Sequence, residues 1–194
     1  MKKKLLDSLD KASKVIHVGG HPDKETGAIM PPIYQTSTYA QSAPGVHKGY
    51  EYTRSHNPTR SRLEECLAAL ENGKHALATA SGISAATLVM HSLPVGSKIL
   101  CGDDIYGGSY RLFTTVFNEI HDFIFIDTTD VKNVEKMITE HNPALIWLET
   151  PTNPMLKITD ISKVCVAAKK IKCKVLVDNT FMSPYFQNPL DLGA

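Results

Sequence analysis

Cysteine is scarce in this sequence, and the few cysteines that occur follow none of the usual patterns. The 194 residues contain four cysteines, at positions 66, 101, 165 and 173. They form no CxxC motif, and no histidine pair lies near them at metal-ligand spacing. Such scattered cysteines are typical of reduced thiols rather than of zinc sites or disulfide frameworks. We therefore predict no metal site and no disulfide.

The sequence also lacks a strong charge of either sign and any long apolar run. Its formal net charge of +1 offers no electrostatic basis for binding nucleic acid or an anionic membrane. No apolar run is long enough to span a bilayer. After Lys2, Lys3 and Lys4 only Leu5 and Leu6 precede Asp7, too few for the apolar region of an export signal. These features favour a cytoplasmic protein without nucleic-acid or membrane partners.

What the sequence does contain is a regular alternation of strand-like and helix-like segments. Short apolar runs predict strands at 75–79, 98–101, 123–126, 145–148 and 174–178. Apolar residues at helical spacing predict helices from a cap at Thr59 to Gly73, and over 83–93, 109–120, 131–141 and 160–170. Each step is close to the roughly 30 residues of a βαβ unit. We predict an α/β fold with three layers, in which a mainly parallel sheet lies between two layers of helices. Strands such as 174–178 would then be buried on both faces.

The first part of the chain has a different character. Residues 33–50 are polar and contain glycine and proline, and they lack an apolar stripe of their own. We predict that residues 1–58 form an arm that packs on another subunit. Residues 59–194 then form the first part of a large domain.

Polar and glycine-rich residues follow several of the predicted strands, at 81–82, 103–108, 149–154 and 178–180. In a parallel sheet the carboxyl ends of the strands line the ligand crevice. Asp178, at one such end, is either a loop or capping residue or a charge that is paired within a site. Because the GxGxxG fingerprint is missing, a phosphate-bearing cofactor is favoured over a dinucleotide, and a Rossmann module is the weakest alternative.

Individual residues at this rim each allow two interpretations. Ser81-Gly82 is either a simple strand–helix turn or the start of a phosphate site at a helix N-terminus. Tyr106 either packs against the protein or stacks on a flat ring. Tyr52 and Arg54 would project to one side of an extended segment, where they form a surface salt bridge or bind a phosphate.

Taken together, several ordered stretches resemble the Cys/Met-metabolism family of pyridoxal-phosphate enzymes, which has the aspartate-aminotransferase-like fold. These stretches are PPIYQTSTY (31–39), YEYTRSHNPTR (50–60), ASGISA (80–85), DDIYGGSYRLF (103–113), ETPTNP (149–154) and VDNTFMSPYFQNPLDLGA (177–194). The resemblance implies pyridoxal 5'-phosphate as cofactor, an amino acid as substrate, and a homo-oligomer, a tetramer built as a dimer of dimers.

The resemblance also implies roles for single residues. Gly82 and Ile83 would bind the cofactor phosphate, which Tyr52 and Arg54 would reach from a neighbouring subunit. Tyr106 would stack on the pyridine ring and act in catalysis, and Asp178 would pair with the ring nitrogen. Thr180 and Asn153 would lie close to the ring, with Glu149 behind them. The residues implied to lie near the substrate are Glu51, Tyr106, Arg111 and Asn153.

Within the family, Glu51 and the run Tyr106-Gly107-Gly108 resemble cystathionine γ-lyase or γ-synthase, and SPYFQ (183–187) favours the lyase. The lysine that forms the family's Schiff base would lie beyond Ala194. We therefore expect the chain to be the N-terminal half of a longer enzyme and inactive alone. The alternatives are γ-replacement on an activated homoserine, as in the synthase, and a non-catalytic half-chain that serves as an assembly partner.

Overall fold

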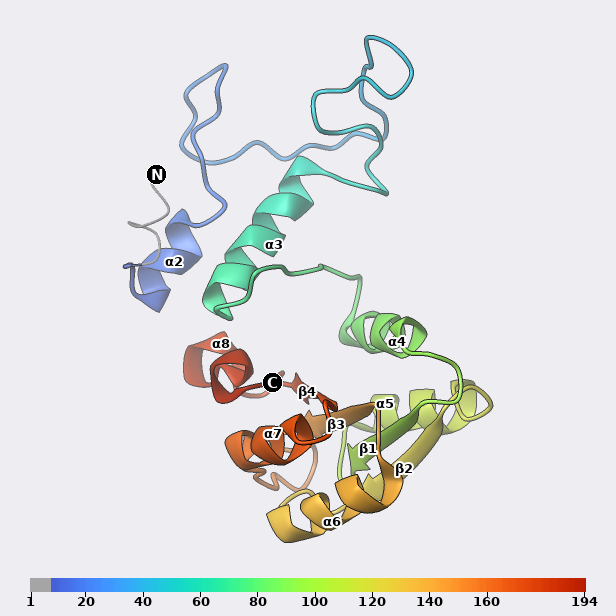
Figure 1. Cartoon of the computed structure of the whole chain (residues 1–194). Coiled ribbons are helices and arrows are strands. Elements are labelled where there is room, and N and C mark those ends of the chain that lie inside the picture. The colour runs from blue at the N-terminus through green and yellow to red at the C-terminus, as the bar shows by residue number, and fades with distance from the viewer. Residues whose placement is uncertain (1–7) are drawn as a thin grey trace. The chain divides into compact units, whose positions relative to one another are not determined.

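The computed structural model describes residues 8–194. The chain divides into two compact units, residues 1–78 and 79–194 (Figure 1). The predicted helix after residue 58 belongs to the first of these units. The expected role of residues 1–58 as an arm for a neighbouring subunit stays a prediction.

The second unit is built on a four-stranded sheet with the order β2-β1-β3-β4. The strands are β1 (Lys98–Gly102), β2 (Asp122–Ile126), β3 (Leu145–Glu149) and β4 (Lys174–Asp178). All neighbouring strands pair in parallel, because a helical segment carries the chain back between successive strands. The predicted α/β fold with a parallel sheet is confirmed.

Helices cover both faces of this sheet. One face is covered by α4 (Gly82–Ser92) and by α5 (Gly107–Arg111) with the π-helical turn η1 (Leu112–Val116), and the other by α6 (Val131–His141) and α7 (Ile161–Lys169). After β4 the chain forms the short helix α8 (Ser183–Phe186) and the 3₁₀ turn η2 (Pro189–Leu192). Along β3, Leu145 and Trp147 pack with α4 and η1, whereas Ile146 and Leu148 pack with α6 and α7. The two-residue period of a strand thus divides the core into two halves.

The first unit contains few regular elements. These are α2 (Lys11–His17), α3 (Pro58–Leu70) and isolated bridges such as Thr38 to Tyr52. Between the two helices several apolar side chains are largely exposed, among them Ile29, Met30 and Ile33. This agrees with the absence of an apolar stripe in the sequence. None of the described helices is long and apolar enough to cross a membrane.

Some sequence predictions about elements are wrong. The segment 75–79 is not a strand, since the N–H of Ala78 donates to the Glu64 carboxylate (3.0 Å) rather than to a neighbouring strand. The cap of α3 is Asn57, whose side chain accepts the N–H of Thr59.

Two further differences concern the sheet and its connections. In the described chain β4 lies at the edge of the sheet, so its residues are only half-buried or exposed instead of buried on both faces. The helix expected over 109–120 begins at Gly107 and ends in the π-helical turn at Val116.

Candidate functional site

The candidate site lies at the carboxyl ends of β1, β3 and β4, which are neighbours in the sheet. Glu149 ends β3 and Asp178 ends β4, and the two residues are register partners. The loop after β1 leads to Tyr106, and the loop after β3 leads to Asn153. The rim therefore brings four predicted residues together because the strands that precede them are parallel and adjacent.

Glu149 is buried, with 6% of its surface exposed. One carboxylate oxygen, Oε2, accepts the backbone N–H of Tyr106, and the other, Oε1, accepts that of Asn153, both at 2.8 Å. Burial raises the pKa of Glu149, and the charges of Asp178 and Asp104 raise it further, while the two N–H bonds act in the opposite direction. The carboxylate thus joins two loops at the centre of the rim.

Tyr106 immediately precedes α5, and its side chain is 46% exposed. Its ring lies directly on the backbone of Gly108, where a Cβ atom would be 3.1 Å from the ring atoms Cδ1 and Cζ and still closer to Cε1. Arg111 lies on the same short helix, and its Nη1 atom would be 3.6 Å from a Cβ atom on Gly107. One part of the ring therefore lies against Gly108, and the exposed part is accessible to a ligand.

Asp178 is half-buried. Its Oδ1 atom accepts both the backbone N–H (3.1 Å) and the hydroxyl of Thr180. No described residue hydrogen-bonds its Oδ2 atom. The next residue, Asn179, exchanges hydrogen bonds with Gln187, which also donates to the carbonyl of Thr150 (3.0 Å). The end of β4 is thereby tied to the loop after β3.

The loop after β3 is itself held by acids of the loop after β1. Asp104 accepts the hydroxyl of Thr152 and the N–H of Met155. Lys157 pairs with Asp103 at 2.9 Å. In this loop the Thr150–Pro151 and Asn153–Pro154 peptides are cis. Asp104 and Gln187 were not predicted as site residues, although both lie in stretches that resemble the family, 103–113 and 177–194. No sequence pattern shows which backbone groups a side chain will bind.

Gly82 and Ile83 form the first turn of α4. The Ser81 side chain caps the helix by accepting the N–H of Ser84 (3.1 Å), and the first helical bond runs from Ala85 N–H to the carbonyl of Ser81. The N–H groups of Gly82 and Ile83 precede this bond, so they are available to an anion. A Cβ atom on Gly82 would meet nothing within 4 Å, which shows open space at this end of the helix.

The remaining predicted residues belong to the first unit. The Arg54 guanidinium lies over the ring of Tyr52, 5.1 Å from its centroid. The two side chains do share one side, but the backbone forms a turn at 52–55 rather than the predicted extended segment, as Ser55 and His56 both donate to the Tyr52 carbonyl. Glu51 is exposed, and its carbonyl accepts the N–H of Tyr39.

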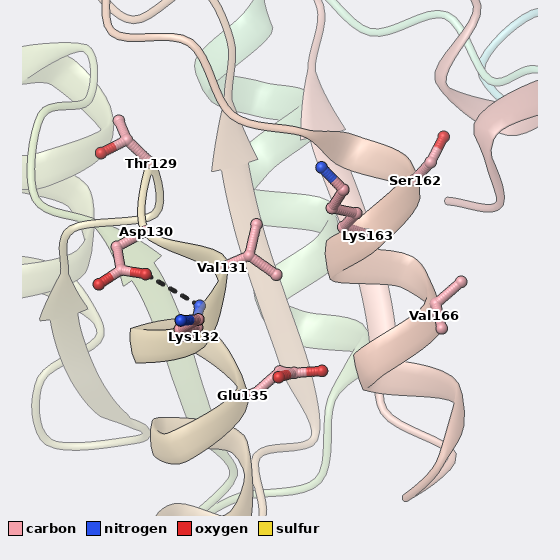
Figure 2. Close-up of a pocket in the computed structure, with 8 residues that line it drawn as sticks. All are labelled: Thr129, Asp130, Val131, Lys132, Glu135, Ser162, Lys163 and Val166. Atoms are coloured by element: carbon pink, nitrogen blue, oxygen red, sulfur yellow. Dashed lines mark hydrogen bonds between the residues drawn. The ribbon is translucent and has the colours of Figure 1, made fainter.

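A pocket lies between the first turns of α6 and α7, and none of the predicted site residues lines it (Figure 2). Two lysines line it, but each helix start is already capped by its own acid. Asp130 accepts the N–H of Lys132 (3.0 Å) and Asp160 that of Lys163 (3.1 Å). In the part of the chain that the structure describes, no group of three His, Cys, Asp or Glu side chains is placed to hold a metal ion.

The residues of the rim fit pyridoxal phosphate. A phosphate could occupy the open space before α4, where two backbone N–H groups are free of helical bonds. A flat ring could stack on the exposed face of Tyr106. The Oδ2 atom of Asp178 offers a carboxylate oxygen to a protonated ring nitrogen.

Several known proteins have sequences similar to that of this chain. The chain is 52% identical over 184 residues to a probable cystathionine gamma-synthase of Herpetosiphon aurantiacus, covering 94% of this chain and 57% of the relative. It is 47% identical to a cystathionine beta-lyase of Coxiella burnetii, covering 93% of this chain and 47% of that one. The chain thus spans about half the length of the curated relatives it matches.

Solved structures agree with this result. The crystal structure of a cystathionine gamma-lyase from Lactobacillus plantarum, complexed with L-serine, matches with a TM-score of 0.91 at 42% identity. The match covers 96% of this chain and 49% of that one. Residues 12–194 also match the family described as Cys/Met metabolism PLP-dependent enzyme. The chain therefore belongs to the Cys/Met metabolism family of pyridoxal-phosphate-dependent enzymes.

Proposed function

We propose that this chain provides the cofactor-binding rim of a cystathionine γ-lyase, which splits cystathionine into cysteine, 2-oxobutanoate and ammonia. The observation that carries the proposal is the convergence of Tyr106, Asn153 and Asp178 on the rim that Glu149 organises. Pyridoxal phosphate, when bound, withdraws electrons from the α-carbon of an amino-acid substrate. The chain's own residues then have to bind the phosphate, support the ring and control its protonation.

Each of these tasks has a residue suited to it. The N–H groups of Gly82 and Ile83 would bind the phosphate, and the Tyr106 ring would support the pyridine. Asp178 would keep a proton on the ring nitrogen through its second carboxylate oxygen, while Thr180 holds the first oxygen in place. Asn153 would contribute to holding the ring.

The first unit has a proposed role in a homo-oligomer. Its exposed apolar residues Ile29, Met30 and Ile33 would be covered by a second copy of the chain. Tyr52 and Arg54, which already stack on each other, would then add a hydroxyl and a guanidinium to the phosphate of that copy. Glu51 and Arg111 would face the substrate.

A second candidate is the γ-replacement reaction of a cystathionine γ-synthase. The 52% identity to a relative with that name favours it. Both reactions use the same cofactor rim, so Tyr106, Asn153 and Asp178 would keep their roles. They differ in whether cysteine is a product or a substrate.

The test uses the protein isolated from its native source, whose intact mass fixes the length of the polypeptide. With pyridoxal phosphate added, one reaction contains cystathionine and is assayed for 2-oxobutanoate and cysteine. The other contains an activated homoserine ester with cysteine and is assayed for cystathionine. Release of 2-oxobutanoate from cystathionine supports the lyase, and formation of cystathionine supports the synthase. A protein that does neither and binds no pyridoxal phosphate refutes the proposal.

A further inference from the structure

We propose that Glu149 is a positioning residue that sets the places of Tyr106 and Asn153 relative to each other. The inference rests on the proposed function, because it concerns how the rim receives the cofactor. It assigns the task to the ionised carboxylate of a residue that need not touch the ligand at all.

The hydrogen bonds of Glu149 connect two loops that follow different strands. Tyr106 follows β1, and Asn153 follows β3. Each oxygen of the single carboxylate accepts one of their backbone N–H groups at 2.8 Å. The carboxylate is planar and rigid, so the two peptides are held on either side of it. The places of the two Cα atoms, and hence the start of both side chains, follow from these two bonds.

The side chain of Tyr106 depends on this support more than an ordinary tyrosine would. Its hydrogen-bonded N–H lies just before a short helix that has no side-chain cap. The residue is 46% exposed, and its ring lies against the backbone of Gly108. Without the bond to Glu149, the peptide before α5 would be free to rotate, and the ring would change its direction.

The environment of Glu149 makes an ionised carboxylate unfavourable at this position. Only 6% of the residue is exposed, and the charges of Asp178 and Asp104 raise the pKa of its buried carboxyl group. An ionised acid in such a place is unfavourable unless hydrogen bonds compensate for it. Here the compensating donors are the backbone N–H groups of Tyr106 and Asn153, the two residues whose side chains are predicted to contact the cofactor. A neutral amide could not accept both N–H groups in this way, because one of its two terminal atoms is a donor.

Other bonds at the rim do not reach both of these residues. Asp104 binds Thr152 and Met155, and the Thr128 and Thr159 hydroxyls bind each other at 2.8 Å beneath the loop. These contacts hold the loop after β3 but do not involve Tyr106. Thr128→Val is therefore a matched control, since it removes one buried hydrogen bond in the same unit and leaves the Glu149 carboxylate in place.

The experiment compares the wild-type protein with the variants Glu149→Gln and Thr128→Val. All three are produced at the length of the native protein. Glutamine keeps the shape of the side chain but turns one acceptor into a donor, which faces a backbone N–H. Amide hydrogen exchange is measured in peptides covering 104–110 and 150–157, together with urea unfolding. The dissociation constant for pyridoxal phosphate is measured by absorbance titration.

We expect Glu149→Gln to exchange faster in both peptides, because one N–H loses its acceptor and the other keeps only a neutral one, and to bind pyridoxal phosphate at least about tenfold more weakly. Thr128→Val should bind as the wild type does, even at equal loss of stability. Equal cofactor affinity in Glu149→Gln and the wild type would overturn the inference but leave the proposed function intact. A wild-type protein that binds no pyridoxal phosphate would overturn both.

Discussion

Replacing Gly108 by alanine tests whether the ring of Tyr106 supports a ligand. An added Cβ atom would lie 3.1 Å from ring atoms Cδ1 and Cζ and closer still to Cε1, well inside ordinary carbon contact distances of about 3.5–4.0 Å. Because the tyrosine is exposed on its other side, the ring moves rather than the backbone. Gly107→Ala is the matched control, since its Cβ atom would meet only Arg111, at an ordinary 3.6 Å.

The two variants should differ in cofactor affinity and not in stability. Each puts alanine into the first turn of α5, which favours the helix by about 0.5–1 kcal/mol. An aromatic stack contributes about 0.5–1.5 kcal/mol, so displacing the ring should weaken binding roughly 2- to 10-fold.

Absorbance titration with pyridoxal phosphate measures the affinity of both variants, and urea unfolding measures their stability. If Gly108→Ala binds as tightly as Gly107→Ala, then Tyr106 does not carry the ring and the reasoning fails.

Three further predictions concern the rim and the core. In the protein at its native length, Asp178→Ala should abolish activity while the unfolding free energy changes by less than about 1 kcal/mol, since this acid is half-buried. Activity near wild type would remove its assigned role. Ile146→Ala should cost about 2–5 kcal/mol in urea unfolding, because Ile146 is fully buried between β3 and the α6–α7 layer; a loss below about 1 kcal/mol would contradict that packing. The pKa of Glu149 is raised above its unfolded value of 4.5, so the folded state holds this proton more tightly. Its contribution to stability is therefore present below pH 4.5 and is lost as pH rises through the folded pKa. Urea unfolding between pH 4 and 8 should show the wild type losing stability relative to Glu149→Gln over this range, and parallel curves would disprove the shift.

The elements with strong local signals were predictable from sequence. The helix α6 has the predicted bounds because Asp130 caps its start and Asn142 ends it in the left-handed conformation, with φ of 46°. Segment 75–79 has the composition of a strand, yet the Glu64 carboxylate takes an N–H that a strand partner would need. The edge position of β4 depends on strand order, which apolar periodicity does not encode.

The site was predictable only to the level of which residues follow which strand. Asp178 and Tyr106 could be proposed because both follow predicted strands in a parallel sheet. The bond from Gln187 to the carbonyl of Thr150 joins segments that are far apart in sequence. Such contacts depend on strand register and on the exact path of two loops, so no local pattern reveals them.

The acids that end β3 and β4 show how two neighbouring carboxylates take different tasks. Glu149 and Asp178 are register partners on paired strands, so their positions in the strands do not distinguish them. Glu149 is buried and both of its oxygens accept backbone N–H groups, which makes it a support for the loops. Asp178 binds Thr180 through one oxygen only. Its charge raises the pKa of Glu149, and a cationic ring nitrogen beside its other oxygen would offset that repulsion. The acid that supports the loops and the acid that we propose to face the ligand are thus distinguished by their hydrogen bonds and not by their positions in the strands.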